Sequence, residues 1–252
     1  MREAGLTLEA SVSPDLCPVL ELRRYALRAG ERETLIELFD REFVETQEAV
    51  GMRVFGQFRD LGDPDSFVWM RGFSDMEQRR RALEAFYGGP VWREHAPAAR
   101  ATMIDTSNVL LLRPIAGLEL DRSRRAAPDS TVDQPGLLAI TIWSLARSTA
   151  VEVPGLFRNV LAAALGAAGI GVLATYASEQ SENTFPGLPV REKEDVFVWM
   201  SMFEDAAHHT QRMSALQQSS RWRSGLQLLE SHLVENEEIL RLSPTPRSAL
   251  HC

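Results

Sequence analysis

The sequence predicts an α+β fold in which two ferredoxin-like βαββαβ units pack sheet to sheet within one chain. The clearest indication is a repeat: the stretch at 67–70, Phe-Val-Trp-Met, returns 130 residues later at 197–200, and the pair Trp92-Arg93 returns at the same offset at 222–223. Because the chain has only five tryptophans, this shared register indicates an internal repeat. A length of 252 residues also suits two units of about 100 to 150 residues.

The first unit spans residues 19–114, and its elements are expected in the order strand, helix, strand, strand, helix, strand. Apolar residues at three- and four-residue steps predict the helix over 31–50, which Gly51 closes. Ser74 and Glu77 have the spacing of a capping box, so the second helix should cover 75–87. Pro90 then opens a short helical segment over 91–101. The expected strands are 19–26, 52–59, 67–73 and 108–113.

The second unit, residues 137–244, repeats this order. Early elements of the two units align at an offset of 118 residues and later ones at 130, so 12 extra residues must lie in the loop at 178–189. Residues 1–18 are expected to be a leader, 115–136 a linker and 245–252 a frayed tail. The expected strands are 137–143, 170–177, 196–203 and 239–242, and the expected helices are 154–168 and 205–217.

One face of a ferredoxin-like sheet is left uncovered by its two helices. Two such sheets in one chain can bury these faces against each other. The predicted architecture is therefore a single-chain dimeric α/β barrel, an intramolecular pseudo-dimer for which further oligomerisation stays open.

The composition narrows the class of protein. With 44% apolar and 25% charged residues, the chain has the make-up of a soluble globular protein. A net charge of -8 opposes nucleic-acid binding, and the most apolar segment, 160–173, is too short for membrane insertion. Cys17 and Cys252 form neither a disulfide framework nor a metal-binding spacing, which favours the cytoplasm. No nucleotide-binding or nucleophile motif occurs, so no cofactor and no metal are expected.

Several motifs of the first unit together resemble the NIPSNAP family of the dimeric α/β-barrel superfamily. They are Leu22-Arg23-x-Tyr25, Phe67-Val68-Trp69-Met70, the Arg-rich stretch 77–83, Pro90-Val91-Trp92 and the run 108–114. The resemblance covers 19–114 well and 137–244 only in outline. It implies the fold and a small organic molecule as ligand. Superfamily members include cofactor-free monooxygenases, cyclases, haem proteins and proteins without known activity, so the family specifies function poorly.

Alternation along the first strand places Glu21, Arg23 and Tyr25 on one face and the leucines at 20 and 22 on the other. We expect the leucines to face the helices and the three polar residues to face a cavity between the two sheets. The alternative is that Glu21 and Arg23 form an interface ion pair while Tyr25 only packs.

Arg71 shares one face of the third predicted strand with Trp69 and becomes Ser201 in the second unit. It is a candidate for holding a carboxylate or enolate. Its alternative place is in solvent at a strand end. Arg23, Trp69 and Trp92 complete the candidate substrate-binding set, although tryptophans repeated in both units are also expected in the core. His95 becomes Gly225 and is a candidate acid or base near neutral pH, unless it lies on the surface.

Two functional hypotheses follow. In the first, the protein binds a small organic molecule in a pocket of its first half. If it is an enzyme, it needs no cofactor and performs proton transfer or oxygenation of an aromatic or polyketide-like substrate. His95 or Glu21 would be its acid or base, Tyr25 a hydrogen-bond donor and Arg71 the anion holder. In the second, the protein is a non-enzymatic scaffold whose leader, linker or 178–189 loop engages a partner.

Overall fold

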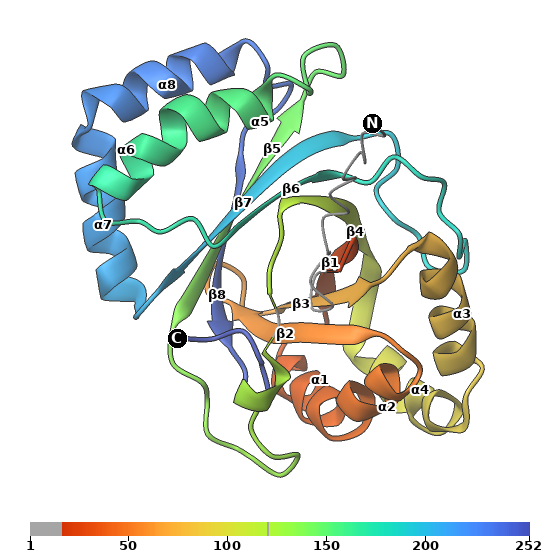
Figure 1. Cartoon of the computed structure of the whole chain (residues 1–252). Coiled ribbons are helices and arrows are strands. Elements are labelled where there is room, and N and C mark those ends of the chain that lie inside the picture. The colour runs from red at the N-terminus through yellow and green to blue at the C-terminus, as the bar shows by residue number, and fades with distance from the viewer. Residues whose placement is uncertain (1–16, 120) are drawn as a thin grey trace, which may run out of the picture.

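The computed structural model describes residues 17–119 and 121–252, so nearly all of the predicted leader lies outside the described residues. Its centre is a closed barrel of antiparallel strands in the order β1-β3-β2-β8-β5-β7-β6-β4 (Figure 1). The strands are β1 (Val19–Leu27), β2 (Arg53–Asp60), β3 (Ser66–Phe73), β4 (Met103–Ala116), β5 (Leu137–Leu145), β6 (Ala174–Ser178), β7 (Asp195–Phe203) and β8 (Glu238–Pro244).

Each half of the chain contributes one four-stranded sheet of the same topology. The first sheet runs β4-β1-β3-β2 and the second runs β8-β5-β7-β6. The sheets join where β2 pairs with β8, as at Phe58 opposite Pro244, and where β4 pairs with β6, as at Leu112 opposite Ser178. Both joints use edge strands, which would otherwise present unpaired backbone groups. The predicted single-chain dimeric α/β barrel is confirmed.

The helices cover the outside of the barrel in two groups, one for each sheet (Figure 1). Asp75 caps α3 (Met76–Tyr87) by accepting a hydrogen bond from the Gln78 backbone N–H at 2.6 Å. Asp205 caps α7 (Ala206–Gln218) in the same way, with the His208 backbone N–H at 2.7 Å. The cap of α3 is thus Asp75 and not Ser74, as the capping-box pattern had suggested. The first group is α1 (Arg32–Leu38), the π-helical turn η1 (Phe39–Phe43), α2 (Val44–Ala49), α3 (Met76–Tyr87) and α4 (Pro90–Thr102). The second is α5 (Val153–Leu156), the π-helical turn η3 (Phe157–Leu161), α6 (Ala162–Ala167), α7 (Ala206–Gln218) and α8 (Ser220–Glu230).

The barrel interior is a continuous apolar core. Leu20 and Leu22 of β1 belong to it, together with Met70, Met200 and residues from other strands around the ring. An eight-stranded barrel is just wide enough for its own side chains to fill. The prediction for β1 was therefore wrong about direction: the leucines face the barrel axis, and the polar residues of β1 face the helices of the first half.

The C-terminal segment is packed, which corrects the expectation of a frayed tail. The Thr245 backbone N–H donates to the Gln57 carbonyl at 2.9 Å, Arg247 forms an ion pair with Glu45, and Leu250 joins the barrel core at 7% exposure. Residues that follow the last strand thus cover one end of the barrel.

The linker is anchored as well. The Leu118 backbone N–H donates to the Tyr176 hydroxyl at 2.8 Å, and Arg125 forms an ion pair of 2.9 Å with Glu48. Arg125 is 7% exposed, so this part of the linker packs against the first half. Among the described residues, no helix is long and apolar enough to cross a membrane.

Candidate functional site

A cavity of about 390 Å³ lies between the first sheet and its covering helices. Aromatic side chains form most of its wall. The π-helical turn η1 brings Phe39 to a ring-centroid distance of 4.8 Å from Trp69 of β3, and Phe43 to 5.5 Å from Trp92 of α4. The second half has the equivalent turn η3, so the π-helical turn belongs to the repeated unit. The aromatic lining suits a largely apolar ligand.

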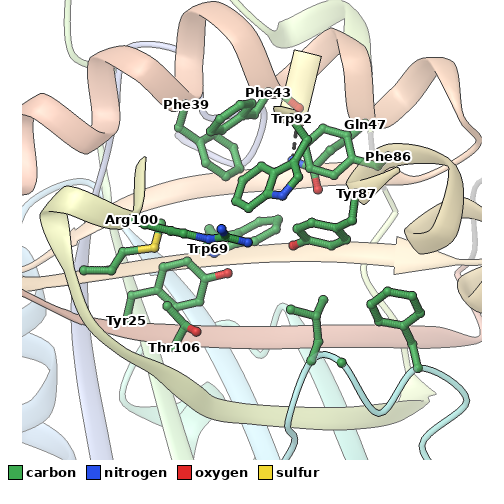
Figure 2. A pocket seen from close by; sticks show the side chains of 14 residues that line it. Tyr25, Phe39, Phe43, Gln47, Trp69, Phe86, Tyr87, Trp92, Arg100 and Thr106 are labelled. Carbon is green, nitrogen blue, oxygen red and sulfur yellow. Dashed lines mark hydrogen bonds between the residues drawn. The ribbon is translucent and has the colours of Figure 1, made fainter. Parts of the chain in front are cut away.

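A small number of polar groups reach into this aromatic cavity. Figure 2 shows the hydroxyl groups of Tyr25 and Tyr87 and the guanidinium of Arg100 pointing toward one another in its middle. Thr106 and Gln47 contribute further polar atoms to the lining. Arg100 is exposed, and its guanidinium carbon lies 5.8 Å from the centroid of the Trp92 ring in a cation–π arrangement. Its guanidinium is therefore accessible to a ligand in the cavity.

A buried charge cluster lies behind the cavity wall. Glu21 accepts hydrogen bonds from Arg71 Nε at 2.7 Å, from Arg23 Nη1 at 2.8 Å and from Arg79 Nε at 2.6 Å. All four side chains are fully buried. One carboxylate thus faces three guanidinium groups, which leaves an excess of positive charge inside the protein.

Two hydrogen bonds connect the charge cluster with the cavity. Arg23 Nε donates to the Tyr25 hydroxyl at 3.0 Å, and Arg71 Nη1 donates to Gln47 Oε1 at 2.9 Å. The Nη2 atoms of Arg23, Arg71 and Arg79 are buried without a hydrogen-bond partner. Unpaired donors of buried cations are costly, so the cluster keeps unsatisfied positive character behind the cavity wall.

Burial and the arginines set the protonation of the site in opposite directions. Burial opposes ionisation of Glu21, but Arg71, Arg23 and Arg79 outweigh burial and hold the pKa of Glu21 well below its usual range. Burial raises the pKa of the Tyr25 hydroxyl, with Arg23 opposing that rise only in part. At neutral pH the site therefore contains a carboxylate and a neutral phenol that can donate a hydrogen bond.

The second half of the chain supplies part of the wall. The loop from 179 to 194, between β6 and β7, reaches α3 of the first half (Figure 1). Arg79 Nη1 donates to Asn183 Oδ1 at 3.0 Å, and Thr184 Oγ1 donates to the Met76 carbonyl at 2.9 Å. Phe185 and Leu188 line the cavity. The insertion found in the sequence is thus part of the site on the other half.

The structure brings most of the predicted site residues together. Tyr25, Trp69 and Trp92 line the cavity, while Glu21, Arg23 and Arg71 form the charge cluster behind it. His95 does not line the cavity. Its Nε2 lies 3.5 Å from Glu42 Oε2, and its ring packs edge-on against Phe43 of the cavity wall, with ring centroids 6.4 Å apart.

The second half has no equivalent charge cluster. At the places of Glu21, Arg23 and Arg71 the second sheet has Ala139, Thr141 and Ser201, as the strand pairing confirms. The same comparison of halves marks the residues that the sequence analysis had not included as site residues. Gln47, Arg79, Tyr87 and Arg100 are replaced there by Leu165, His209, Gln217 and Glu230.

Comparison with known proteins supports the fold and the family of the first half. Residues 20–117 match the NIPSNAP family, as the resemblance predicted. A NIPSNAP-like domain protein from Burkholderia xenovorans shares 26% identity, with a TM-score of 0.36 and coverage of 38% of this chain and 84% of its own. None of the curated proteins matches the sequence.

Some solved structures extend over both halves of the chain. A candidate monooxygenase from Fusobacterium nucleatum has a TM-score of 0.59 at 8% identity and covers 91% of this chain and 93% of its own. An anthrone oxidase-like protein has a TM-score of 0.53 at 10% identity, with 93% and 95% covered. At these identities the likeness concerns the fold.

Proposed function

We propose that this chain, whose residues 20–117 form a NIPSNAP domain, binds an aromatic organic anion in the cavity of its first half. The observation that carries the proposal is the buried cluster of three arginines around Glu21, directly behind an aromatic wall. Its excess positive charge favours negative charge in the cavity, and the low dielectric of the interior strengthens this effect. The aromatic rings supply the contact area.

We propose further that the protein is an enzyme that oxygenates such a ligand without a cofactor. The substrate would lose a proton to solvent water to give an enolate, and the enolate would then react with dioxygen. For a ring CH₂ group, one O₂ yields a carbonyl and one water. Tyr25, a neutral phenol fixed by Arg23, would donate a hydrogen bond to the enolate oxygen, and the charge cluster would stabilise its charge. The overall likeness to a candidate monooxygenase and to an anthrone oxidase-like protein agrees with this reaction class.

We also propose that the two units arose by duplication and that the protein is cytoplasmic. The repeated Phe-Val-Trp-Met stretch and the shared strand order support a tandem duplication, with units at 19–114 and 137–244. Cys17 and Cys252 are not joined in a disulfide, which suits the reducing cytoplasm.

Fluorescence titration with two isosteric probes tests the binding proposal. 2-Naphthoate carries a carboxylate, whereas 2-naphthamide is neutral. We expect preference for the anion, and we expect Arg100→Gln to weaken 2-naphthoate binding by about tenfold, the loss of one charge-assisted hydrogen bond. Arg93→Gln, on the same helix but outside the cavity, is the matched control. Equal affinity for both probes would contradict the proposal.

Oxygen consumption with anthrone as substrate tests the reaction. We expect uptake above the uncatalysed rate and a decrease of about 100-fold in kcat for Tyr25→Phe. Binding of 2-naphthoate without any turnover would instead support the scaffold or carrier alternative.

A further inference from the structure

The loop at 179–194 closes a cavity that belongs to the other half of the chain. We call these residues the capping loop. Phe185 and Leu188 of this loop line the cavity, and Phe185 stacks on Tyr87 with ring centroids 6.0 Å apart and an interplanar angle of 21°. Because the Tyr87 hydroxyl points into the cavity (Figure 2), this stacked pair borders the space that a ligand would occupy.

The capping loop is held in shape by its own hydrogen bonds. Phe185 N–H donates to Asn183 Oδ1 at 3.1 Å, Asn183 Nδ2 donates to the Leu188 carbonyl at 3.0 Å, and Leu188 N–H donates to the Phe185 carbonyl at 3.0 Å. A wall that is ordered before the ligand arrives costs less entropy on binding.

Arg79 attaches the capping loop to the charge cluster. Its Nε donates to Glu21 Oε1 at 2.6 Å, while its Nη1 donates to Asn183 at 3.0 Å and to Thr184 Oγ1 at 3.3 Å. The same guanidinium therefore touches the groups that supply the site's charge and the loop that covers it.

Within the described residues, a loop of this length covers the first half and no loop of this length covers the second half. The matched connection in the first half, between β2 and β3, is limited to residues 61–65. The half with the charge cluster is the half that is capped, and the half without the cluster is not. An insertion without a role in the site would have no reason to follow this distribution.

We propose that Phe185 and Leu188 are specificity-determining residues of the first-half site, and that they contact the distal ring of a planar anionic ligand with fused rings. The inference rests on the proposed binding function and specifies its substrate class. A ligand with one ring, held by its carboxylate at Arg100, would leave this outer wall untouched. A fused second ring would bury apolar surface against it.

The test compares the affinities of 2-naphthoate and benzoate by titration calorimetry. We expect Phe185→Ala to weaken 2-naphthoate binding by about tenfold or more, the loss of one buried aromatic contact, and benzoate binding by less than about twofold. Phe185→Leu should retain much of the selectivity because it keeps an apolar wall. Pro186→Ala, an exposed change in the same loop that does not line the cavity, is the matched control and should leave both affinities unchanged.

The ratio of the two affinities separates the outcomes, since a general loss of structure would weaken both probes alike. If wild-type protein binds both probes and Phe185→Ala leaves the ratio of their affinities unchanged, the role of the capping loop is overturned and the proposed function stands. Wild-type protein that binds neither probe would overturn both. An equal loss for both probes in Phe185→Ala and Phe185→Leu would show that the loop only supports the fold, and would also overturn the inference.

Discussion

Glu21 of β1 lies directly opposite Arg71 of β3, and Glu21 Oε2 is 2.7 Å from Arg71 Nε with both side chains fully buried. Two more arginines share the same carboxylate. A carboxylate held by three cations is a weak base, so its main physical effect is to keep the guanidinium groups inside the protein. The remaining positive charge is what the cavity offers to a ligand.

Glu21→Gln should destabilise the protein strongly, because it leaves three buried guanidinium groups without a counter-charge. We expect the free energy of unfolding in urea at pH 7 to decrease by about 3–5 kcal/mol. Glu77→Gln, which removes an exposed partner of Arg80, should leave it nearly unchanged. Comparable decreases in the free energy of unfolding for the two variants would show that Glu21 does not stabilise the buried arginines.

The pH dependence of the same pair gives a second test. The pKa of Glu21 is depressed in the folded protein, so its stabilising effect is complete above the unfolded value of about 4.3 and is lost as the pH falls below it. The difference in unfolding free energy between wild type and Glu21→Gln should therefore shrink from pH 5 to pH 3. A difference that stays constant over this range would contradict the depressed pKa.

Asp40 should change the stability of the protein with pH in the direction opposite to Glu21. Burial raises its pKa to about 7, although Thr245 and Arg247 oppose the rise. The folded protein then binds a proton that the unfolded chain releases near pH 4, so stability falls as the pH increases from about 4 to 7. We expect Asp40→Asn to remove this slope and to be more stable than wild type at pH 8 by roughly 2–4 kcal/mol. Asp129→Asn, an exposed change, should keep the wild-type slope in urea titrations.

Two of the three tyrosines should resist ionisation. Burial raises the pKa of Tyr25, and it raises that of Tyr176 despite a hydrogen bond from Leu118 N–H. At pH 10.5, near the ordinary tyrosine pKa of about 10, the phenolate absorbance at 295 nm of native protein should be far below that of protein in urea. Tyr25→Phe and Tyr176→Phe should leave the native signal unchanged. A native signal equal to the denatured one would contradict the burial of both hydroxyls.

The packed C-terminal segment predicts a stability effect outside the site. Leu250 is 7% exposed in the barrel core, so Leu250→Ala should lower the free energy of unfolding by about 2–4 kcal/mol. Leu228→Ala removes a leucine that is 56% exposed and should change it by less than about 0.5 kcal/mol. A negligible effect at Leu250 would indicate that the segment does not support the barrel.

The order of elements and the pairing of two sheets could be predicted because they depend on periodicity and on the repeat. Alternation on β1 also grouped Glu21, Arg23 and Tyr25 correctly. It could not give the direction of that face, since residues on both faces of β1 are buried and an apolar residue suits either layer. The charged residues faced the helices because the narrow barrel interior has no room for a solvated cavity.

The candidate site was therefore predicted in its central strands and incomplete at its edges. Arg79, Tyr87 and Arg100 lie on helices whose polar residues have no periodic signal that separates a site from a solvated face. The comparison that singled out Arg71, namely its replacement in the other half, would have identified them as well. The destination of the 178–189 insertion could not be deduced, because loop composition does not specify which surface a loop covers.

Because the two sheets belong to one chain, their sequences can evolve separately. In a barrel built from two identical chains, every substitution appears on both sides, so an improved binding wall and its cover must coexist in one sequence. Here Arg79 and Asn183, which meet across the halves, are encoded separately. One half is free to specialise in chemistry while the other specialises in enclosure.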